Sequence, residues 1–148
     1  MFYFLSLGSN QGDREAHMQA ACREIETRCG HIVRRSADYH SAPWGYQSDH
    51  EYLNIVIALT TPLSPPELLR ETQAIERALG RTLKSRQHRD EKPVYQDRPI
   101  DIDLLEAYDH DPRDGNAREY RTDTDSLTLP HPLMGERPFV QQPLSEIR

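Results

Sequence analysis

The sequence predicts an α+β fold, in which one antiparallel sheet is flanked by helices. Three observations predict it: the length suits one domain, strand-like and helix-like segments alternate along the chain, and both helices have clear start signals. The chain has 148 residues, and domains commonly hold roughly 100–200 residues, so we expect a single domain over residues 1–148.

Short apolar runs with alternating or β-branched residues predict the strands of the sheet. They cover residues 2–7, 31–40, 52–59, 100–104 and 127–130. The run at 52–59, YLNIVIAL, is apolar enough for a central position in the sheet. The run at 127–130 is short, and we expect it at an edge. A turn cluster, Gly8-Ser9-Asn10, follows the first strand.

Two helices are expected between these strands. Asp13 can cap the first, which runs to about Cys29 with apolar residues at helical spacing and is followed by Gly30. The second begins at residues 64–67, SPPE, where the Ser N-cap, the Pro and the Glu form a capping box, and Gly80 ends it. The resulting order, βαββαβ, is that of the ferredoxin-like sandwich. Residues 132–148 are expected to form a closing loop with a turn of helix.

Composition and charge exclude several classes of function. The net charge of −6 and the isoelectric point near 5.6 argue against nonspecific binding to nucleic acid or anionic membrane. No apolar run approaches the roughly 20 residues of a membrane span, and the N-terminal run lacks the flanks of a signal peptide. We therefore expect a cytoplasmic protein. Cys22 and Cys29 would lie roughly 10 Å apart on one helix, too far for a disulfide.

The charge is distributed unevenly along the chain. Residues 81–98 hold six basic and three acidic residues, whereas residues 101–125 hold nine acidic residues and three arginines. Residues 107–126 are nearly devoid of aliphatic side chains and contain Asp-Pro and Asp-Gly turn pairs, so we expect an exposed acidic insertion. A basic segment running into an acidic one suggests a site that handles a polyanion and a metal, although such runs are also typical of solvated surface.

Asp101 and Asp103 are the most informative local feature. Residues i and i+2 of a strand share a face, so the two carboxylates would lie about 6–7 Å apart while Ile100, Ile102 and Leu104 face the core. Two such carboxylates repel unless they are protonated, paired with a cation or bound to metal, and their oxygens suit Mg²⁺. The alternative is a strand with a merely solvated polar face.

The neighbouring residues favour phosphate chemistry at this strand. Phosphoryl transfer needs cations on the phosphates, and residues 81–98 supply arginines and lysines, while no P-loop or Rossmann phosphate motif is present. Tyr52 and Asn54 share a strand face, where an aromatic ring and an amide can hold a flat heterocycle. Core packing for Tyr52 and a structural role for His131, which lies between two prolines, are the alternatives.

Four motifs together resemble the 6-hydroxymethyl-7,8-dihydropterin pyrophosphokinase family, in the family's order and over about residues 2–147. They are Leu7-Gly8-Ser9-Asn10, the YHSAPWG loop at residues 39–45, Gly80-Arg81 with the DRPIDID run at residues 97–103, and Leu129-Pro130-His131-Pro132. Tyr52, Asn54, Gln73 and Glu76 also stand where the family has them.

The resemblance implies transfer of pyrophosphate from MgATP to the hydroxymethyl group of the pterin, with release of AMP in folate biosynthesis. It assigns two Mg²⁺ ions to Asp101 and Asp103, and phosphate contacts to Arg81 and Arg98, with Arg98 the main catalytic helper. Residues 81–98 correspond to the family's mobile catalytic loop. The pterin would be held by Ser41, Ala42, Pro43, Trp44, Tyr52, Asn54 and Phe139. The ATP site would be lined by Gln73, Glu76, Leu104, Thr128, His131 and Arg137.

The chain also departs from the family. Leu83 stands where a second loop arginine is common, Tyr95 replaces a frequent Trp, and residues 107–126 have no family counterpart. A homologue that binds ATP or pterin without catalysis, and a nucleic-acid-binding ferredoxin-like module, are therefore the alternative functions. We expect a monomer or weak dimer with small-molecule partners, and neither nucleic acid nor membrane.

Overall fold

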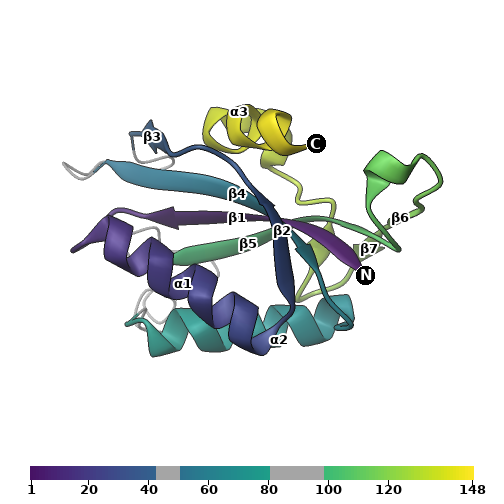
Figure 1. The fold of residues 1–148 in the computed structure, drawn as a ribbon, viewed down its shortest axis with the longest axis horizontal. Helices are drawn as coiled ribbons and strands as arrows, with labels where there is room; N and C mark the ends of the chain where they lie inside the picture. The colour runs from purple at the N-terminus through teal and green to yellow at the C-terminus, as the bar shows by residue number, and fades with distance from the viewer. Residues whose placement is uncertain (43–50, 81–98) are drawn as a thin grey trace.

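The computed structural model describes residues 1–42, 51–80 and 99–148, and it has three layers. Helices α1 (Arg14–Arg28) and α2 (Pro65–Ala78) cover one face of a sheet, and α3 (Pro138–Ile147) covers part of the other (Figure 1). The fold is therefore α+β with an antiparallel sheet and flanking helices, as predicted. None of the helices in the described ranges is long and apolar enough to cross a membrane.

All strand pairings in the main sheet are antiparallel, in the order β2-β4-β1-β5-β6, with β3 paired to one end of β4. The strands are β1 (Phe2–Ser9), β2 (His31–Arg35), β3 (Tyr39–Ser41), β4 (Tyr52–Thr60), β5 (Asp101–Tyr108) and β6 (Glu119–Tyr120). Strands β7 (Thr122–Asp123) and β8 (Thr128–Leu129) form a separate two-stranded sheet. Each apolar run expected to be a strand contributes at least one, with β2 and the start of β3 both in the 31–40 run, and β1 and β4 are central. The run at 127–130 contributes β8, which pairs with β7 and does not lie at an edge of the main sheet.

Both predicted helix starts are confirmed by their hydrogen bonds. The Asp13 carboxylate accepts from the Ala16 N–H at 3.1 Å. At α2 the Ser64 hydroxyl accepts from the Glu67 N–H at 3.4 Å, while the Glu67 carboxylate accepts from the Ser64 N–H at 2.9 Å. This reciprocal pair is a capping box, which satisfies N–H groups that the first turn leaves without intrahelical partners.

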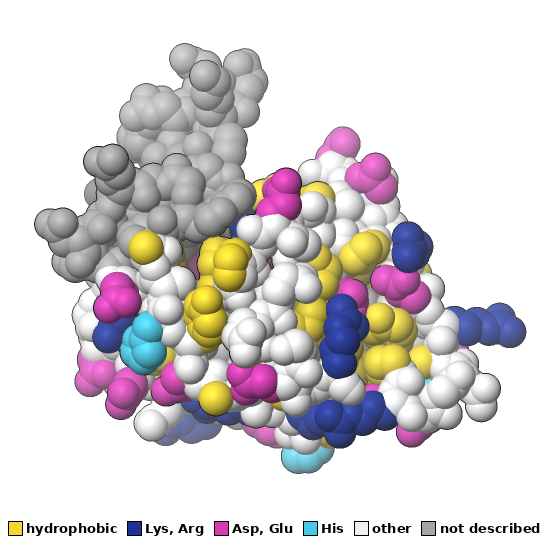
Figure 2. Space-filling view, turned by 90° about the horizontal axis from the view of Figure 1, so that it is seen from above, with side chains coloured by type: hydrophobic (Ala, Val, Ile, Leu, Met, Phe, Trp, Pro, Cys, Tyr) yellow, Lys and Arg dark blue, Asp and Glu magenta, His cyan; other side chains and the backbone are white. Residues whose placement is uncertain are grey.

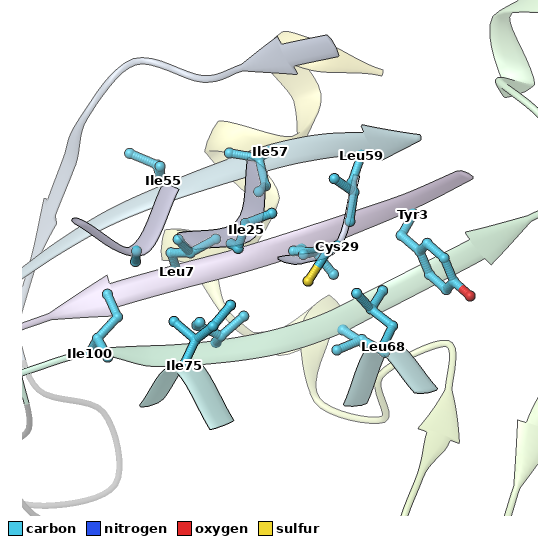
Figure 3. Packing of buried hydrophobic residues seen from close by; sticks show 14 of the residues in the cluster. Tyr3, Leu7, Ile25, Cys29, Ile55, Ile57, Leu59, Leu68, Ile75 and Ile100 are labelled. Carbon is cyan, nitrogen blue, oxygen red and sulfur yellow. The ribbon is translucent and has the colours of Figure 1, made fainter. Parts of the chain in front are cut away.

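The first core lies between the sheet and helices α1 and α2 (Figure 3). Tyr3, Leu5 and Leu7 alternate along β1, and Ile55, Ile57 and Leu59 do so along β4, all fully buried. They meet Met18, Ile25, Leu68 and Ile75 of the two helices. Ile100, Ile102 and Leu104 belong to this core, as the strand alternation predicts.

The second core lies under α3, on the opposite face of the sheet. Phe2, Phe4, Val56, Ala58 and Leu105 pack there against Val140, Leu144 and Ile147. Residues 132–148 were expected to be a loop with a turn of helix, and this expectation was wrong. Although Pro143 lies inside the segment, its apolar residues at helical spacing find this second apolar face and form a ten-residue helix.

The acidic segment 107–126 is only partly the exposed insertion that we expected. Ala107 and Tyr108 continue β5, and Ala107 is buried. β6 and β7 follow, after a single turn of 3₁₀ helix at residues 112–114. The middle of the segment is exposed, but Asp111 is half-buried against the body of the protein. Both cysteines are free thiols, as the spacing predicted.

We expect Ser64→Ala to lower the free energy of unfolding by about 1 kcal/mol, because it removes the hydroxyl half of the capping box. Urea unfolding followed by circular dichroism measures this change. The exposed Ser126→Ala is the control and should stay within about 0.5 kcal/mol of the parent protein. Equal effects of the two substitutions would contradict a stabilising role for the cap.

Candidate active site

The candidate site lies on the α3 face of the sheet, where three strands bring polar residues together. Gly8 of β1 pairs with Asn54 of β4 on one side and with Asp101 of β5 on the other. Directly opposed residues of antiparallel strands share a face, so these three residues form one row. In the next row Ser6 lies between Val56 and Asp103. Because Val56 packs under α3, both rows lie on that face.

Gly8 allows the site to be closely packed. A Cβ atom at this position would lie 3.2 Å from Asn54 Oδ1 and 3.3 Å from Tyr52 Cδ1. The Tyr52 ring and the Asn54 amide therefore lie directly over the Gly8 backbone. The sequence had suggested a turn cluster at Gly8-Ser9-Asn10, but β1 continues through Ser9. The absence of a side chain at Gly8 instead lets residues of the neighbouring strand β4 pack closely over the β1 backbone.

The Asn54 side chain is fixed by strand β3. Its side chain is buried, and Nδ2 donates to the Tyr39 carbonyl at 3.1 Å and to Ser41 Oγ at 2.8 Å. These bonds leave Oδ1 over Gly8. Ser41 ends β3, and the exposed Ala42 follows it, so both lie beside this amide. Pro43 and Trp44 lie outside the described residues.

The two aspartates are next to a cation from α3. Asp101 and Asp103 are partly exposed, and Arg137 Nη1 lies 3.6 Å from Asp103 Oδ2. Arg137 is the N-cap residue of α3, and its guanidinium lies 5.7 Å from the centre of the Phe139 ring. The first residues of α3 therefore bring a positive charge and an aromatic ring to the edge of the carboxylate pair.

Among the described residues, one edge of β5 has no strand neighbour at its first residues, since β6 pairs only with Ala107 and Tyr108. The buried Glu76 of α2 reaches this edge, where its Oε2 accepts from the Ile102 N–H at 2.8 Å. Farther along the same strand, the His131 N–H donates to the Leu105 carbonyl at 2.8 Å. An α2 carboxylate and the His131 loop therefore border the strand segment that carries the aspartates.

His131 is held as a neutral imidazole with a defined tautomer. The pKa of His131 is lowered to about 4, chiefly by burial and also by the nearby Arg137, while Asp101 acts in the opposite direction. The Leu133 N–H donates to Nδ1 at 3.1 Å, so the proton of the neutral ring is on Nε2. At neutral pH this side chain offers an uncharged hydrogen-bond donor.

The remaining predicted ATP-site residues lie at different depths. The Leu104 side chain is buried in the first core, so only its backbone can meet a ligand. Gln73 lines a cavity of about 210 Å³ with Leu127 and other residues of α2 and the acidic segment. Thr128 on β8 donates its hydroxyl to Asp123 at 3.0 Å. Arg81 and Arg98 lie outside the described residues, as does the predicted catalytic loop.

Charges on the α3 side of the molecule are mixed. Viewed from that side, acidic and basic side chains are interspersed, and neither sign covers one continuous area of the described surface (Figure 2). Among the described residues, no group of three or more His, Cys, Asp or Glu side chains is placed to hold a metal. A metal at the aspartates would therefore take its other ligands from substrate or water, as Mg²⁺ commonly does.

A sequence model of the 7,8-dihydro-6-hydroxymethylpterin-pyrophosphokinase (HPPK) family matches residues 4–148. The chain belongs to the HPPK family. This confirms the resemblance that the four motifs indicated, and it favours a pyrophosphokinase of folate biosynthesis over both alternative functions.

Individual relatives agree with the HPPK assignment. The 2-amino-4-hydroxy-6-hydroxymethyldihydropteridine pyrophosphokinase of Porphyromonas gingivalis is 44% identical over 144 residues, which are 97% of this chain and 88% of that protein. The Bacillus subtilis enzyme of the same name is 34% identical over 145 residues, 97% of this chain and 76% of that protein. A crystal structure of an HPPK-DHPS in complex with substrates shares the fold, with a TM-score of 0.62. The structural match covers 99% of this chain and 40% of the HPPK-DHPS chain, at 12% sequence identity.

We expect the protein to lose stability as the pH falls from about 6.5 to about 4, in part because of His131. The pKa of this group is lower in the folded state, so in this range the unfolded chain takes up a proton that the folded imidazole does not. His131→Asn keeps an acceptor for the Leu133 N–H but cannot be protonated. Urea unfolding at pH 7 and pH 5 should show a smaller loss for this variant than for the parent.

The exposed His40 provides the control, since His40→Asn should keep the pH dependence of the parent protein. A His131→Asn variant whose stability falls as steeply as that of the parent would show that His131 is not held neutral by the fold.

Proposed function

We propose that the chain transfers pyrophosphate from MgATP to 6-hydroxymethyl-7,8-dihydropterin, giving the pterin diphosphate and AMP. The reaction would take place on the open half of the α3 face, the part around Gly8, Asn54 and Asp101 that no helix of the described residues covers. The row Asn54, Gly8 and Asp101 carries this proposal, because it places a heterocycle-binding amide on β4 and a carboxylate on β5, on either side of Gly8 of β1. We keep the sequence-based predictions of a cytoplasmic location and of a monomer or weak dimer as part of the proposal.

The pterin would bind over Gly8. Tyr52 offers a ring face there, and Asn54 offers an oriented amide whose Nδ2 is already engaged by β3. Phe139, at the start of α3, would provide the second aromatic surface, and Ser41 to Trp44 would contact the edges of the heterocycle. Stacking on aromatic rings with a few directed polar contacts is the usual way to hold such a ligand.

Two Mg²⁺ ions would be held by Asp101 and Asp103. The residues fit this ion because two partly exposed carboxylates share a face, offer only oxygen, and leave room for phosphate and water ligands. Bound Mg²⁺ would neutralise phosphate charge and align the reacting oxygens. Arg137, already beside Asp103, would contact the ATP phosphates from the opposite side.

ATP would lie along the edge of β5 that no strand of the described residues covers. Alternate residues of a strand direct their N–H and C=O groups to the same edge, so the backbone of Leu104 faces the side on which Ile102 meets Glu76. These backbone groups suit a nucleobase edge. Gln73, Glu76, Thr128 and His131 would surround the nucleotide, with the Nε2–H of His131 as a neutral donor.

Catalysis would depend on positioning and charge rather than on a general base. His131 interacts electrostatically with Asp101, but its Nδ1 is occupied by the Leu133 N–H. Phosphoryl transfer is accelerated chiefly by alignment and by cations on the phosphates. Arg98 and Arg81, outside the described residues, would supply that charge, and Arg98 would act mainly in the transition state.

Replacing either aspartate should remove most of the activity. We expect Asp103→Ala or Asp101→Ala to lower kcat/KM by at least about 10³, or ~4 kcal/mol, because each removes a metal ligand. Release of AMP from ATP, Mg²⁺ and the dihydropterin measures the reaction. The exposed Asp125→Ala should behave as the parent does. Near-normal turnover by Asp103→Ala would contradict the metal assignment.

Gly8→Ala tests the pterin site. The added methyl group must push away the Tyr52 ring or the Asn54 amide, so the KM for the pterin should rise about tenfold while the KM for ATP changes little. Gly135→Ala is a matched control, because a Cβ there would meet nothing within 4 Å. An unchanged pterin KM in a folded Gly8→Ala protein would place the pterin elsewhere.

A further inference from the structure

The acidic segment 107–126 contributes a contact that the site described above does not use. Arg34 of β2 donates from Nη1 to Asp111 Oδ2 at 2.6 Å and from Nη2 to Asp111 Oδ1 at 3.1 Å. The same guanidinium donates from Nε to the Ile147 carbonyl at 2.8 Å. One arginine thus joins the acidic segment to the last residue of α3.

Arg113 of the acidic segment reaches the same end of the helix. Its Nη2 donates to the Ile147 carbonyl at 3.4 Å, and its Nε donates to the Arg148 carbonyl at 2.8 Å. Asp111 in turn accepts from the Arg113 N–H at 3.0 Å. We call Arg34, Asp111 and Arg113 the α3 clamp. It gives hydrogen bonds and positive charge to the carboxyl end of a helix, where both are stabilising.

The clamp is more than an exposed surface ion pair. The side chains of Arg34 and Asp111 are only 16% and 27% exposed, the pairing is bidentate, and the guanidinium lies 5.3 Å from the centre of the Phe2 ring. Hydrogen bonding to Arg34 is the main cause that holds the pKa of Asp111 below its usual range. Bidentate, partly buried arginine pairs order their surroundings far better than solvated pairs do.

Helix α3 needs such support because it is weak by itself. It has ten residues, no side-chain hydrogen bond at its N-cap, and Pro143 in its interior. Pro143 has no N–H to give to the Phe139 carbonyl, so the first half of the helix lacks one intrahelical hydrogen bond. Helices of this length are marginal without tertiary contacts, so the position of α3 is set by its packing and its ends.

The other end of α3 enters the active site. Arg137 pairs with Asp103, and Phe139 lies beneath that guanidinium. About 15 Å of helix separates these residues from the clamp, and Val140, Leu144 and Ile147 pack the helix between them onto one core. We propose that the α3 clamp positions Arg137 and Phe139 for substrate binding, so that Asp111 of the acidic segment is a positioning residue for the reaction. This inference rests on the proposed roles of Arg137 and Phe139.

Asp111→Asn tests the inference, since Asn removes the charge but keeps an acceptor for the Arg113 N–H. We expect the KM values for pterin and ATP to rise about three- to tenfold with kcat within about twofold. Hydrogen–deuterium exchange of the α3 amides should also become faster. Asp114→Asn changes an exposed carboxylate of the same 3₁₀ turn and should alter neither measurement.

Phe139→Ala tests whether the clamp affects substrate binding through Phe139. If the clamp acts through Phe139, adding Asp111→Asn to Phe139→Ala should raise the pterin KM by much less than it does in the parent. Unchanged KM values in Asp111→Asn would overturn the inference, and so would unchanged hydrogen–deuterium exchange of the α3 amides. It would also be overturned if the effects of Asp111→Asn and Phe139→Ala on both KM values were fully additive. If Phe139→Ala and Arg137→Ala both leave the KM values unchanged, the proposed roles of Phe139 and Arg137 in substrate binding are wrong. The link from the clamp to activity then fails as well, whatever the hydrogen–deuterium exchange of α3 shows.

Discussion

Strand β1 pairs with β4 on one side and β5 on the other, and the register of these two ladders puts Asn54 and Asp101 on either side of Gly8. The site depends on this register, because a shift of one residue in either ladder would turn the aspartates or the amide toward the opposite face. The register is itself fixed by burial. Tyr3, Leu5 and Leu7 can only face α1 and α2, and Phe2 and Phe4 can only face α3.

Within the part of the chain that the structure describes, the second face is covered only in part, and this explains where the site is. Helices α1 and α2 cover the first face along the sheet, whereas α3 is a single ten-residue helix on the other (Figure 1). Past the N-terminal end of α3, this face of the sheet carries Ser6, Gly8, Asn54 and the two aspartates in place of apolar side chains. The same helix thus closes a core and brings Arg137 and Phe139 to the edge of the open half.

Much of this arrangement could be predicted from local signals. The capping box at Ser64, the Asp13 cap, and the two aspartates opposite core residues each depend on neighbours within a few positions, and the structure has all of them. The ordered motifs gave the family, which the comparisons confirm. Helix α3 was missed because Pro143 weakens its local signal and the face that stabilises it is formed by distant strands.

Long-range contacts could not be predicted in this way. Arg34 and Asp111 are 77 positions apart, and nothing near either residue indicates its partner. Gly8 looked like a turn residue, because its reason lies in β4, where the Tyr52 ring passes over it. In both cases the physical cause is a neighbour in space that only the folded sheet provides.

The central claim is that Asp101 and Asp103 hold the metal beside the row formed by Gly8 and Asn54. Paramagnetic broadening of backbone amide signals by Mn²⁺, added with a non-hydrolysable ATP analogue, tests it most directly. The account predicts that the signals of Ser6, Gly8 and residues 101–104 are lost first, while those of Asp109, Asp114 and Asp125 persist. Preferential loss of the signals of the acidic segment 107–126, with those of Gly8 and Asp103 retained, would contradict it.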